Sequence, residues 1–450
     1  MSKITVPEDV LWLTRKFKER GHTAFCVGGC VRDSLLGIEP HDWDLTTSAI
    51  PEQIIQVLER NNIAYHTVGI EFGTVTAIIH SEEYEITTYR LEANYEDGRH
   101  PSNIAWSKSI YEDLARRDFS INAIAYDCDS DEFIDPYNGI LAIKNRVLVA
   151  VGFPEDRFDE DALRILRAIR FIIKYDMSVS PDTDVAIHEK YKGLAQVSKE
   201  RITEEFRKIL TCGKPVFYTF LGYHDVIFFL IPELKMCYKF NQNNRYHTHD
   251  VYEHILHVVD KCKTKKFEIK MAALLHDIGK PDCYSEDENG FGHFYGHPEV
   301  SGIITNSVLS SDFKVTSSEK ELILKLVENH DMSLVETRKS IRRAMLKFGV
   351  DFLNDFFILK QADMDDHIYP DDKYITTTDN FKSIMQELID EDACFSMKDL
   401  AIDGNDIMKL LNIKTGKRVG EILNILLDEV IEEKLENKYE ILAERVLKMT

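Results

Sequence analysis

Hydrophobic and polar positions follow two different periods along this chain of 450 residues, and the period changes near residue 150. Before that point, short apolar runs are separated by turn residues, a pattern typical of β-strands. One segment with helical spacing, PEQIIQVLERN, begins with Pro51, a residue that the first turn of a helix accepts. The predicted strands are TAFCV, WDLTT, IAYHTV, GTVTAIIH and YEITTYR.

Helical spacing starts at RFDEDALRILRAIRFIIKY and continues to the C-terminus. Two polar stretches interrupt it, TCGKP near residues 212–215 and KFNQNNRYHTHD before a helical block from about 250 to 366. A third stretch, YPDDKYITTTDN, is typical of a linker. A chain of this length is expected to contain three or more subdomains. We predict an α+β fold with a mixed α/β head followed by three all-α segments, with boundaries 1–150, 151–245, 246–370 and 371–450.

Composition places the chain among globular proteins, with 44 % hydrophobic and 10 % aromatic residues. There is no run of about 18 uncharged apolar residues, and MSKITVPEDV lacks the core of a signal peptide. Eight cysteines are scattered without a CxxC pair, which suits free thiols in a reducing compartment. We therefore expect a cytoplasmic protein with no membrane partner.

The formal net charge of −22 argues against a protein that coats nucleic acid without specificity, and we expect no DNA partner. A local basic groove remains compatible with this charge. Part of the negative charge can lie where metal ions neutralise it.

The segment FCVGGCVRDSLLGIEPHDWDLTTS, residues 25–48, contains two aspartates in alternation. In a strand, Asp42 and Asp44 lie on one face, about 7 Å apart, while Trp43 points to the other side. Two such carboxylates repel each other unless a cation joins them, and oxygen ligands of this kind suit Mg²⁺. Glu85, in YEITTYR, adds a third acid, and three carboxylates can hold two Mg²⁺ ions for phosphoryl transfer.

The residues before this acidic pair fit a phosphate site. Gly28 and Gly29 let backbone N–H groups approach a triphosphate closely. Arg32, at the start of the following helix, can neutralise phosphate charge, and Asp33 is expected to brace the turn or the sugar. An isolated pair of alternating aspartates is more often a solvated strand edge, but the combination favours a site.

Together these residues resemble the signature of the DNA polymerase β-type nucleotidyltransferase superfamily. More narrowly, they resemble the class II tRNA nucleotidyltransferases, the CCA-adding enzymes. The resemblance implies a tRNA 3′ end, CTP and ATP as partners, Mg²⁺ as cofactor, and addition of CCA without a nucleic-acid template. It continues through nearly the whole chain.

LARRDFSINAIAYD, residues 114–127, resembles the second motif of this family. The resemblance implies that Arg117 contacts the triphosphate, while Asp118 and Asn122 serve the ribose and hold the pocket. Asp118 and Asn122 are four residues apart, so one helical turn would bring them together. Alternatively, Arg116 and Arg117 are a solvated pair without chemistry.

DEDALRILRAIRF, residues 159–171, is expected to be a helix with one stripe of charged residues every three positions. These are Asp161, Arg164, Arg167 and Arg170. One interpretation is an amphipathic helix with an i,i+3 salt bridge, worth a few tenths of a kcal/mol. In the other, Asp161 accepts from an exocyclic amine while Arg164 donates to the neighbouring ring nitrogen.

This second interpretation gives base selection. CTP and ATP match the edge formed by Asp161 and Arg164, whereas UTP and GTP leave charged groups unpaired at a cost of about 1–3 kcal/mol or more. The resemblance implies the same role for the EDxxR motif, here Glu160 to Arg164. It also implies that Arg167 and Arg170 help to bind phosphates or the RNA end.

Other segments bear on which member of the superfamily the chain resembles, but they do not distinguish a CCA-adding enzyme from an A-adding enzyme. RLEANYEDGRHPSNIAW, residues 90–106, resembles the flexible loop of full CCA-adding and A-adding enzymes, although an ordinary surface loop is an equal alternative. Bacterial poly(A) polymerases carry a basic segment where this chain has TVGIEFGTV, but an A-adding enzyme or a poly(A) polymerase stays open. SKERITEEFRKIL resembles the neck helix of the family, and we assign it no chemistry. Lys414, Lys417 and Arg418 can face RNA phosphates or be solvated.

A second constellation lies between residues 250 and 366. Imidazoles and carboxylates on apolar helices are ligands of divalent transition metals. The candidates resemble the set of the HD superfamily of metal-dependent phosphohydrolases, in that superfamily's order. They are His254, His276, Asp277, His297, His330 and Asp363.

Three points about this second constellation stay open. His257 or His249 could replace His254 as the first ligand, and Lys280 could contact a phosphate. The HD block could hydrolyse phosphodiester or phosphomonoester bonds at RNA ends or in small nucleotides, or it could be a scaffold. It could also be the main activity, with the head reduced to nucleotide sensing.

Overall fold

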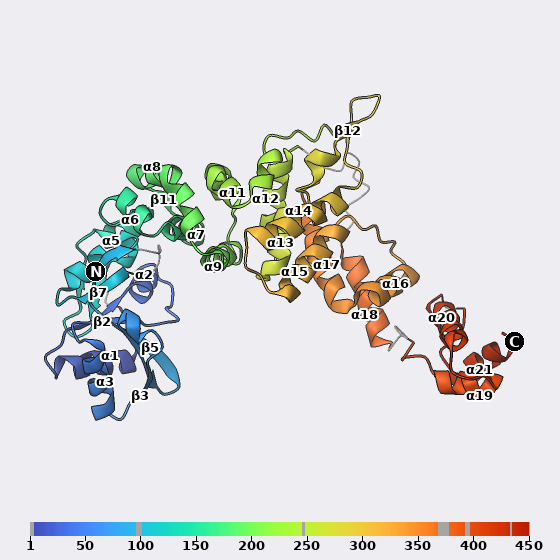
Figure 1. Ribbon diagram of the computed structural model, residues 1–450, viewed down its shortest axis with the longest axis horizontal. Coiled ribbons are helices and arrows are strands. Elements are labelled where there is room, and N and C mark those ends of the chain that lie inside the picture. Colours follow the sequence, from blue (N-terminus) through green and yellow to red (C-terminus); the bar gives the residue numbers. More distant parts are fainter. Residues whose placement is uncertain are drawn as a thin grey trace. The chain divides into compact units, whose positions relative to one another are not determined.

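The computed structural model describes residues 4–95, 101–244, 248–367, 378–391, 397–432 and 434–449. The fold divides into two compact units (Figure 1). The first unit contains Met1–Pro232 and Asp312–Lys314, and the second contains Glu233–Ser311 and Val315–Thr450.

A seven-stranded sheet, in the order β3-β4-β5-β2-β1-β8-β9, forms the centre of the head. Each of the five predicted strand runs overlaps one strand of this sheet, so those predictions are confirmed, whereas β8 and β9 were not predicted. β2 and β5 run parallel with Leu45 opposite Ile86, so the residues just before β2 lie beside Glu85 on β5. The strands are β1 (Ala24–Val27), β2 (Leu45–Thr47), β3 (Ala64–His66), β4 (Thr74–Ile79), β5 (Glu82–Thr88), β8 (Ala125–Asp127) and β9 (Glu132–Ile134).

Five helices accompany the sheet of the head. The predicted helix at Pro51 is confirmed as α3, whose first residue is this proline. The helices are α1 (Glu8–Lys18), α2 (Gly29–Leu35), α3 (Pro51–Arg60), α4 (Ile110–Ala115) and α5 (Gly139–Asn145). A separate antiparallel pair, β6 (Arg90–Tyr95) and β7 (Pro101–Trp106), occupies the predicted loop region. The middle of that loop, residues 96–100, lies outside the described residues, so the loop hypothesis stays a prediction.

The rest of the first unit is mainly helical, as predicted. Its helices are α6 (Pro154–Glu160), α7 (Leu163–Tyr175), α8 (Pro181–Lys190), α9 (Lys199–Leu210), α10 (Phe217–Gly222) and α11 (His224–Leu230). The predicted interruption at TCGKP is confirmed, because α9 ends at Leu210 and α10 begins at Phe217. A short parallel pair, β10 (Val147–Leu148) with β11 (Ser178–Val179), was not predicted.

The prediction of one continuous helix over residues 159–171 is wrong. Asp161 has extended backbone angles, φ −151° and ψ 98°, and separates α6 from α7. Its carboxylate accepts the backbone N–H of Leu163 at 3.1 Å. A short acidic side chain competes with helical hydrogen bonds in this way, so it starts a new helix instead of continuing the old one.

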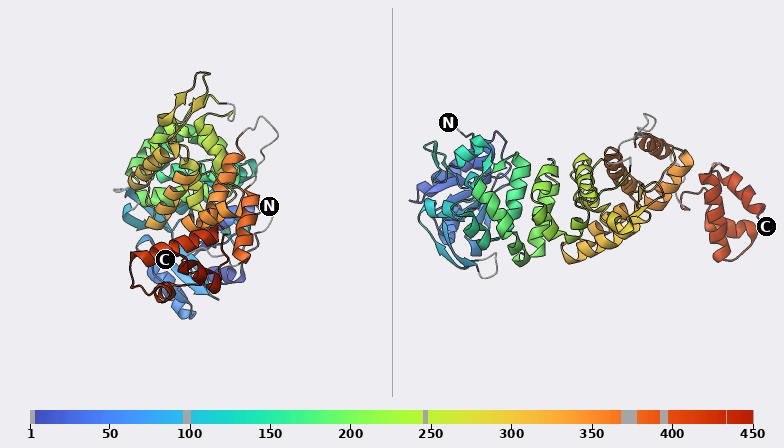
Figure 2. Two further views of the ribbon diagram at one scale, coloured as in Figure 1. Left: turned by 90° about the vertical axis from the view of Figure 1, so that its right-hand side faces the viewer. Right: turned by 90° about the horizontal axis from the view of Figure 1, so that it is seen from above.

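In the described residues of the second unit, the regular structure is helical apart from the short hairpin β12 (Ser285–Glu286) and β13 (Gly292–His293), which was not predicted. Figure 2 shows that helices form nearly all of the ribbon from green to red. They are α12 (Val251–Lys261), α13 (Phe267–Leu275), α14 (His297–Ser311), α15 (Ser317–Asn329), α16 (Arg338–Phe348), α17 (Val350–Met364), α18 (Asp379–Asp390), α19 (Gly404–Leu411), α20 (Lys417–Ile431) and α21 (Tyr439–Leu447). Most of the predicted linker, residues 368–377, lies outside the described residues.

Two further features of the described residues bear on the predictions from composition. No described helix combines the length and the apolar character needed to cross a bilayer. The seven cysteines in the described part of the chain are all free, as predicted.

Candidate active and metal sites

A cavity of about 870 Å³ lies in the first unit, and its lining is strongly cationic. Among its described lining residues are eight arginines and one lysine but only four aspartates. In a chain with a net charge of −22, this is a local reversal of sign. Arginine clusters of this kind bind phosphate groups through charge-assisted hydrogen bonds, so the cavity is suited to a polyphosphate ligand.

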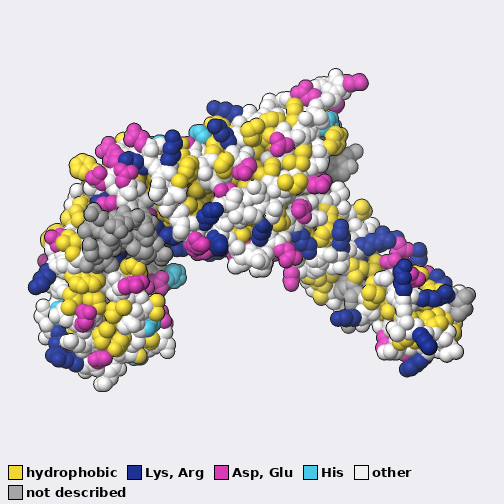
Figure 3. All heavy atoms as spheres, viewed as in Figure 1, with side chains coloured by type: hydrophobic (Ala, Val, Ile, Leu, Met, Phe, Trp, Pro, Cys, Tyr) yellow, Lys and Arg dark blue, Asp and Glu magenta, His cyan; other side chains and the backbone are white. Residues whose placement is uncertain are grey.

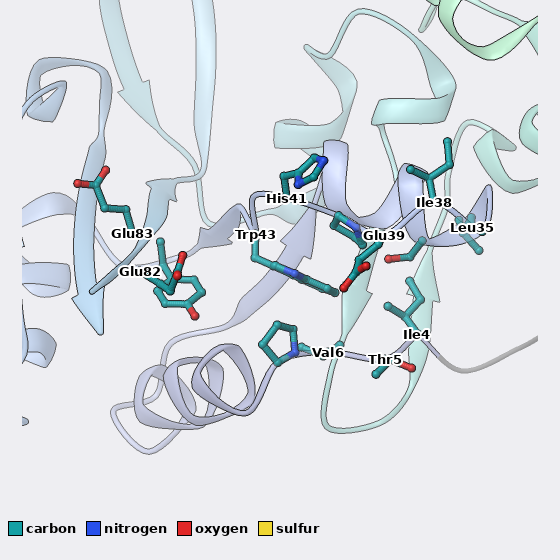
Figure 4. Close-up of a pocket in the computed structure, with 15 residues that line it drawn as sticks. Ile4, Thr5, Val6, Leu35, Ile38, Glu39, His41, Trp43, Glu82 and Glu83 are labelled. Atoms are coloured by element: carbon teal, nitrogen blue, oxygen red, sulfur yellow. The ribbon is translucent and has the colours of Figure 1, made fainter. Parts of the chain in front are cut away.

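The two aspartates of the acidic pair line this cavity, and the tryptophan between them does not. Asp42 and Asp44 are lining residues, whereas Trp43 is buried and lines a second cavity of about 830 Å³. Figure 4 shows Trp43 pointing into that second cavity, toward Val6. β2 begins only at Leu45, but the carbonyl of Asp44 already accepts the backbone N–H of Val27 at 3.1 Å. Backbone pairing with β1 therefore begins at Asp44, before β2 itself. The predicted alternation, with Asp42 and Asp44 on one side and Trp43 on the other, is confirmed.

The electrostatics of the acidic pair favour a bound cation. Burial and the neighbouring charge of Glu85 raise the pKa of Asp44 to about 6, and Asp42 adds to the repulsion. Arg117 and Arg32 oppose this shift but do not cancel it. The carboxylates are therefore under-neutralised by the protein, and hard oxygen donors in this state are suited to a divalent metal ion.

Gly28 stands where only glycine fits. It has φ +74°, and a Cβ atom there would lie 3.0 Å from Nη1 of Arg117. The residue joins β1 to α2 and allows the backbone to approach the cavity beside Gly29. The prediction of bare backbone at this position is therefore confirmed by its conformation.

Arg32 is buried and held in one orientation by three neighbours. Its Nη1 donates to Asn122 Oδ1 at 2.6 Å, its Nε donates to Asp33 Oδ1 at 2.8 Å, and its guanidinium lies 4.8 Å from the ring centre of Tyr175. The Tyr175 hydroxyl donates to the same oxygen of Asp33 at 2.9 Å. Asp33 is not among the described lining residues of the cavity, so its contacts support the bracing role and not a contact with the sugar.

The alternative that Arg116 and Arg117 are a solvated pair is wrong. Both donate to Asp113, whose side chain is fully buried, at 2.7 and 3.2 Å respectively. Burial by itself raises the pKa of Asp113, but these two arginines outweigh it and the pKa is lowered. Both arginines also line the cavity.

Asp118 and Asn122 lie together, as predicted, although the turn between them is a 3₁₀ helix, Ser120–Asn122. Asp118 accepts from Asn122 Nδ2 at 2.9 Å and from Arg167 Nε at 2.8 Å. Burial alone would raise the pKa of Asp118, yet Arg167 and Asn122 hold it at about 2. Asp118 therefore stays ionised and fixes Arg167 at the cavity wall.

Asp161 and Arg164 both line the cavity, each with a partner that the sequence did not suggest. Asp161 accepts from both terminal nitrogens of Arg201 on α9, at 3.2 and 2.7 Å. Arg164 donates to Glu160 Oε2 at 2.7 Å and to the carbonyl of Arg116 at 3.0 Å. Arg201 lies in SKERITEEFRKIL, to which we assigned no chemistry.

Arg170, the last member of the predicted stripe, lines the cavity and pairs with the buried Glu205 on α9. Two ion pairs thus tie α7 to α9, Asp161–Arg201 just before α7 and Arg170–Glu205 within it. In the sequence, the one indication of these ion pairs is that Arg201 and Glu205 are four residues apart on α9. This spacing places both side chains on one face of the helix but does not indicate which residues they contact.

The second unit brings all six predicted HD residues into one cluster around Asp277. Its carboxylate lies 3.3 Å from His254 Nε2, 3.2 Å from His276 Nε2 and 3.1 Å from His297 Nε2. His330 Nε2 is 3.5 Å from Asp277, and Asp363 is 3.3 Å from His254. Residues from five helices or helix ends therefore meet at one buried point.

All four imidazoles of this cluster present the same nitrogen to its centre. The Nδ1 atoms of His276, His297 and His330 lie 2.7–2.8 Å from the backbone carbonyls of Ala273, Phe294 and Val327. The Nδ1 of His254 lies 2.8 Å from Asp366 Oδ2. With Nδ1 turned outward, each Nε2 faces the centre. This is the orientation of metal-ligating histidines, which bind a metal ion once Nε2 has lost its proton.

Orphaned polar atoms show that this cluster fits a metal ion. Among the described residues, His276 Nε2 and Asp277 Oδ1 are buried and make no hydrogen bond of good geometry, although Asp277 lies within 3.2 Å of His276 and His297. Two sets of donors, His254 with His276 and Asp363, and His276 with Asp277 and His330, each lie within 4.8 Å of one another. Burial lowers the pKa of His254, but the carboxylates of Asp277, Asp363 and Asp366 raise it to about 10, so the cluster attracts a cation.

Two sequence-based alternatives for this cluster can now be judged. His249 and His257, the possible substitutes for His254, lie in a different group with Asp366. Lys280 is buried, and its Nζ lies 2.6 Å from Asp277 and donates to Gln242 Oε1 at 2.9 Å. Its first role is therefore to neutralise Asp277, although it also lines a cavity of about 590 Å³ at the cluster.

Lysine and arginine side chains gather over the C-terminal helices on the face that Figure 3 shows. Lys414, Lys417 and Arg418 are all exposed. Nothing in their surroundings distinguishes an RNA contact from a solvated surface, so their role stays a prediction.

Models of known families match four segments of the chain. Residues 24–149 match "Poly A polymerase head domain", and residues 176–236 match "Probable RNA and SrmB- binding site of polymerase A". Residues 245–363 match "HD domain", and residues 372–446 match a model described as tRNA nucleotidyltransferase domain 2.

Relatives resemble the chain along nearly its whole length. The CCA-adding enzyme of Ligilactobacillus salivarius is 31 % identical over 440 residues, which cover 97 % of this chain and 95 % of the relative. The CCA-adding enzyme of Streptococcus suis is 29 % identical over 434 residues, covering 96 % and 94 %.

Solved structures share the fold. The Bacillus stearothermophilus CCA-adding enzyme in complex with CTP has a TM-score of 0.70 at 23 % identity, covering 99 % of this chain and 98 % of that one. The Thermotoga maritima CCA-adding enzyme complexed with tRNA-CCA has a TM-score of 0.62 at 20 % identity, covering 99 % and 96 %.

The raised pKa of Asp44 can be measured in metal-free protein. Infrared difference spectra, with Asp44→Asn as the reference, should show this carboxyl losing its proton near pH 6, above the ordinary value of 3.8. Glu85→Gln should lower the midpoint, because it removes one repelling charge and leaves burial unchanged. Glu83→Gln, which changes an exposed acid on the same strand, is the matched control. An unchanged midpoint in Glu85→Gln contradicts the coupling.

Proposed function

The chain belongs to the family of CCA-adding enzymes, and from this premise we propose that it builds or repairs the 3′-terminal CCA of tRNA from CTP and ATP without a nucleic-acid template. The observation that carries the proposal is the under-neutralised pair Asp42 and Asp44 at the wall of a cavity otherwise lined by cations. The match to CCA-adding enzymes along 97 % of the chain supports this over poly(A) synthesis.

In this proposal the 3′-hydroxyl of the RNA attacks the α-phosphate of CTP or ATP, and pyrophosphate leaves. Asp42 and Asp44 would hold Mg²⁺, with Glu85 completing the site. Mg²⁺ bound there supplies neutralisation of the charge that develops on the phosphoryl oxygens. Glu85, which is exposed, is the proposed acceptor of the hydroxyl proton. It lies on the strand beside the acidic pair.

The arginines of the cavity would bind the triphosphate. Arg117 borders Gly28 and Arg32 borders Gly29, where the backbone approaches the cavity, so these arginines are the proposed contacts for the leaving pyrophosphate. Because Asn122 and Asp113 already fix their guanidinium groups, little side-chain entropy is lost when the ligand binds. Asp118 and Asn122 are the proposed ribose contacts.

Asp161 and Arg164 are the proposed base-selecting pair. Arg201 donates hydrogen bonds to both oxygens of Asp161, and Glu160 accepts one from Arg164. The side chains of Asp161 and Arg164 are therefore positioned before a base binds. A carboxylate oxygen has more than one lone-pair site, so Asp161 can still accept from an exocyclic amine. CTP and ATP offer amine donor then ring acceptor, and UTP and GTP offer the reverse. Arg167 and Arg170 are proposed to help with phosphates or the RNA end.

A second activity is proposed for the HD cluster, hydrolysis of phosphodiester or phosphomonoester bonds at RNA ends or in small nucleotides. The orphaned nitrogen of His276 and oxygen of Asp277 favour it, because they fit a divalent transition metal next to an open cavity. A metal ion bound there supplies an activated water. Lys280 and the imidazole Nδ1 bonds keep the ligands in place.

Truncated tRNA transcripts test the main proposal. Transcripts that end before CC, before C and before A are incubated with each nucleoside triphosphate, separately and mixed. We expect CMP addition to the first two and AMP addition to the third. Addition of AMP alone indicates an A-adding enzyme, and long A tails indicate a poly(A) polymerase.

Asp42→Ala should abolish nucleotide addition, by at least about 10³-fold, because the cation site loses a ligand. tRNA binding should stay nearly intact, since the acid does not attract RNA. Both are measured by primer extension and by filter binding. Glu39→Ala, three residues earlier, is the control and should be active. Undiminished addition by Asp42→Ala refutes the assigned role.

Arg164→Ala should relax base selection as well as slow addition. The ratio of CTP to UTP incorporation should fall by about 10- to 100-fold, equivalent to about 1–3 kcal/mol for one charged hydrogen bond. Competition assays with mixed triphosphates measure this ratio. Lys174→Ala, on the same helix but outside the cavity lining, is the control. Slower addition with unchanged selection counts against the base-selecting edge.

His276→Ala should remove metal-dependent phosphate release from small nucleotides and leave nucleotide addition unchanged. Asp42→Ala should abolish nucleotide addition and leave phosphate release unchanged, so each variant is the control for the other. Phosphate release that survives in His276→Ala means that the HD cluster is not its source. Absence of any release from the unaltered protein supports the scaffold alternative.

A further inference from the structure

The described part of the second unit contains a third group of metal-binding side chains, outside the HD cluster. His249, His257 and Asp366 each offer one ligand atom, and these three atoms lie within 4.8 Å of one another. The centres of the two imidazole rings are only 4.4 Å apart. We propose that these residues form a separate site for one transition-metal ion of the Zn²⁺ type. The inference does not depend on nucleotide addition.

Local helix geometry accounts for the position of the two histidines. α12 starts with a capping box in which Asp250 accepts from the backbone N–H of Glu253 at 2.8 Å. Glu253 and His257 are four residues apart on α12 and lie on one face of the helix. His249 lies just before the N-cap, where its ring packs against that of His257. Glu253 Oε2 is 3.8 Å from His249 Nδ1, which places a further oxygen beside the group.

Asp366 reaches the same place from the end of α17, which packs against α12. It is buried at 8 % exposure, so its charge needs compensation. Lys261 Nζ lies 2.6 Å from Oδ1, and His254 Nδ1 lies 2.8 Å from Oδ2. Each carboxylate oxygen has two lone-pair sites, so both bonds leave Asp366 able to ligate a metal.

The donor set indicates the class of ion. Two imidazoles with one or two carboxylates suit Zn²⁺, Co²⁺ or Ni²⁺, whereas Mg²⁺ and Ca²⁺ prefer oxygen ligands alone. The two histidines are half-buried, so an ion can reach them from solvent. The alternative, a pair of packed imidazoles with nearby ion pairs, predicts no bound metal.

The site would lie one hydrogen bond from the HD cluster. Asp366 Oδ2 bonds to His254 Nδ1, and His254 Nε2 faces Asp277 and Asp363 in the cluster. An ion on Asp366 withdraws charge from the acceptor that orients His254. Occupancy of the outer site should therefore weaken metal binding in the cluster, and by linkage the effect is reciprocal.

Metal stoichiometry of the full chain tests this inference. Metal-free protein is titrated with Zn²⁺ by calorimetry, and bound metal is measured after gel filtration. The variant His249→Gln/His257→Gln should bind one equivalent fewer than the unaltered chain. His276→Ala should instead lose the cluster's ion and keep the outer one. His188→Gln/His224→Gln in the first unit is the matched control and should change nothing.

A rescue variant excludes a merely structural effect. His257→Cys keeps a ligand, so with Co²⁺ it should regain the lost equivalent and show a thiolate-to-cobalt absorption band. Circular dichroism checks that each variant is folded. Unchanged stoichiometry in the folded double glutamine variant, or no cobalt–thiolate band in His257→Cys, overturns the site.

Discussion

Buried carboxylates must be neutralised, and this one constraint organises both units of the protein. Asp113, fully buried in the head, is balanced by Arg116 and Arg117, and Asp118 is balanced by Arg167. Each pair also fixes an arginine at the cavity wall. The same electrostatic requirement that acts on the fold therefore also positions the arginines that are proposed to bind phosphate.

Asp44 is the exception, and it supports the proposed position of the catalytic region. Its pKa is raised to about 6 because burial and Glu85 are only partly opposed by Arg117 and Arg32. A pKa shifted by burial and a like charge in a cavity is typical of a functional carboxylate. The protein leaves a deficit of positive charge at the place where a bound metal ion would supply it.

The second unit solves the same problem with imidazoles instead of arginines. Asp277 is surrounded by His254, His276 and His297 and by the buried ammonium of Lys280. An arginine stays charged and remains paired with its carboxylate, whereas an imidazole can lose its proton and then present a lone pair to a metal ion. This difference supports the proposals that the HD cluster accepts a metal ion and that the arginine network of the head accepts an anion.

Sequence alone determined those features that depend on short-range order. Period-two runs predicted five strands, Pro51 predicted a helix start, and the alternation of Asp42, Trp43 and Asp44 predicted their opposite faces. The order of histidines and aspartates indicated the six members of the HD cluster. These follow from backbone geometry and residue chemistry within a few positions, together with family resemblance.

Tertiary structure decided what depends on partners far apart in the chain. The parallel register of β2 and β5 sets Glu85 beside Asp44, and Arg201 reaches Asp161 across 40 residues. The same holds for the choice of His254 over His249 and His257, which depends on where Asp277 and Asp366 lie. Periodicity carries no information about such contacts, because an ion pair is selected by the packing of whole elements and not by local spacing.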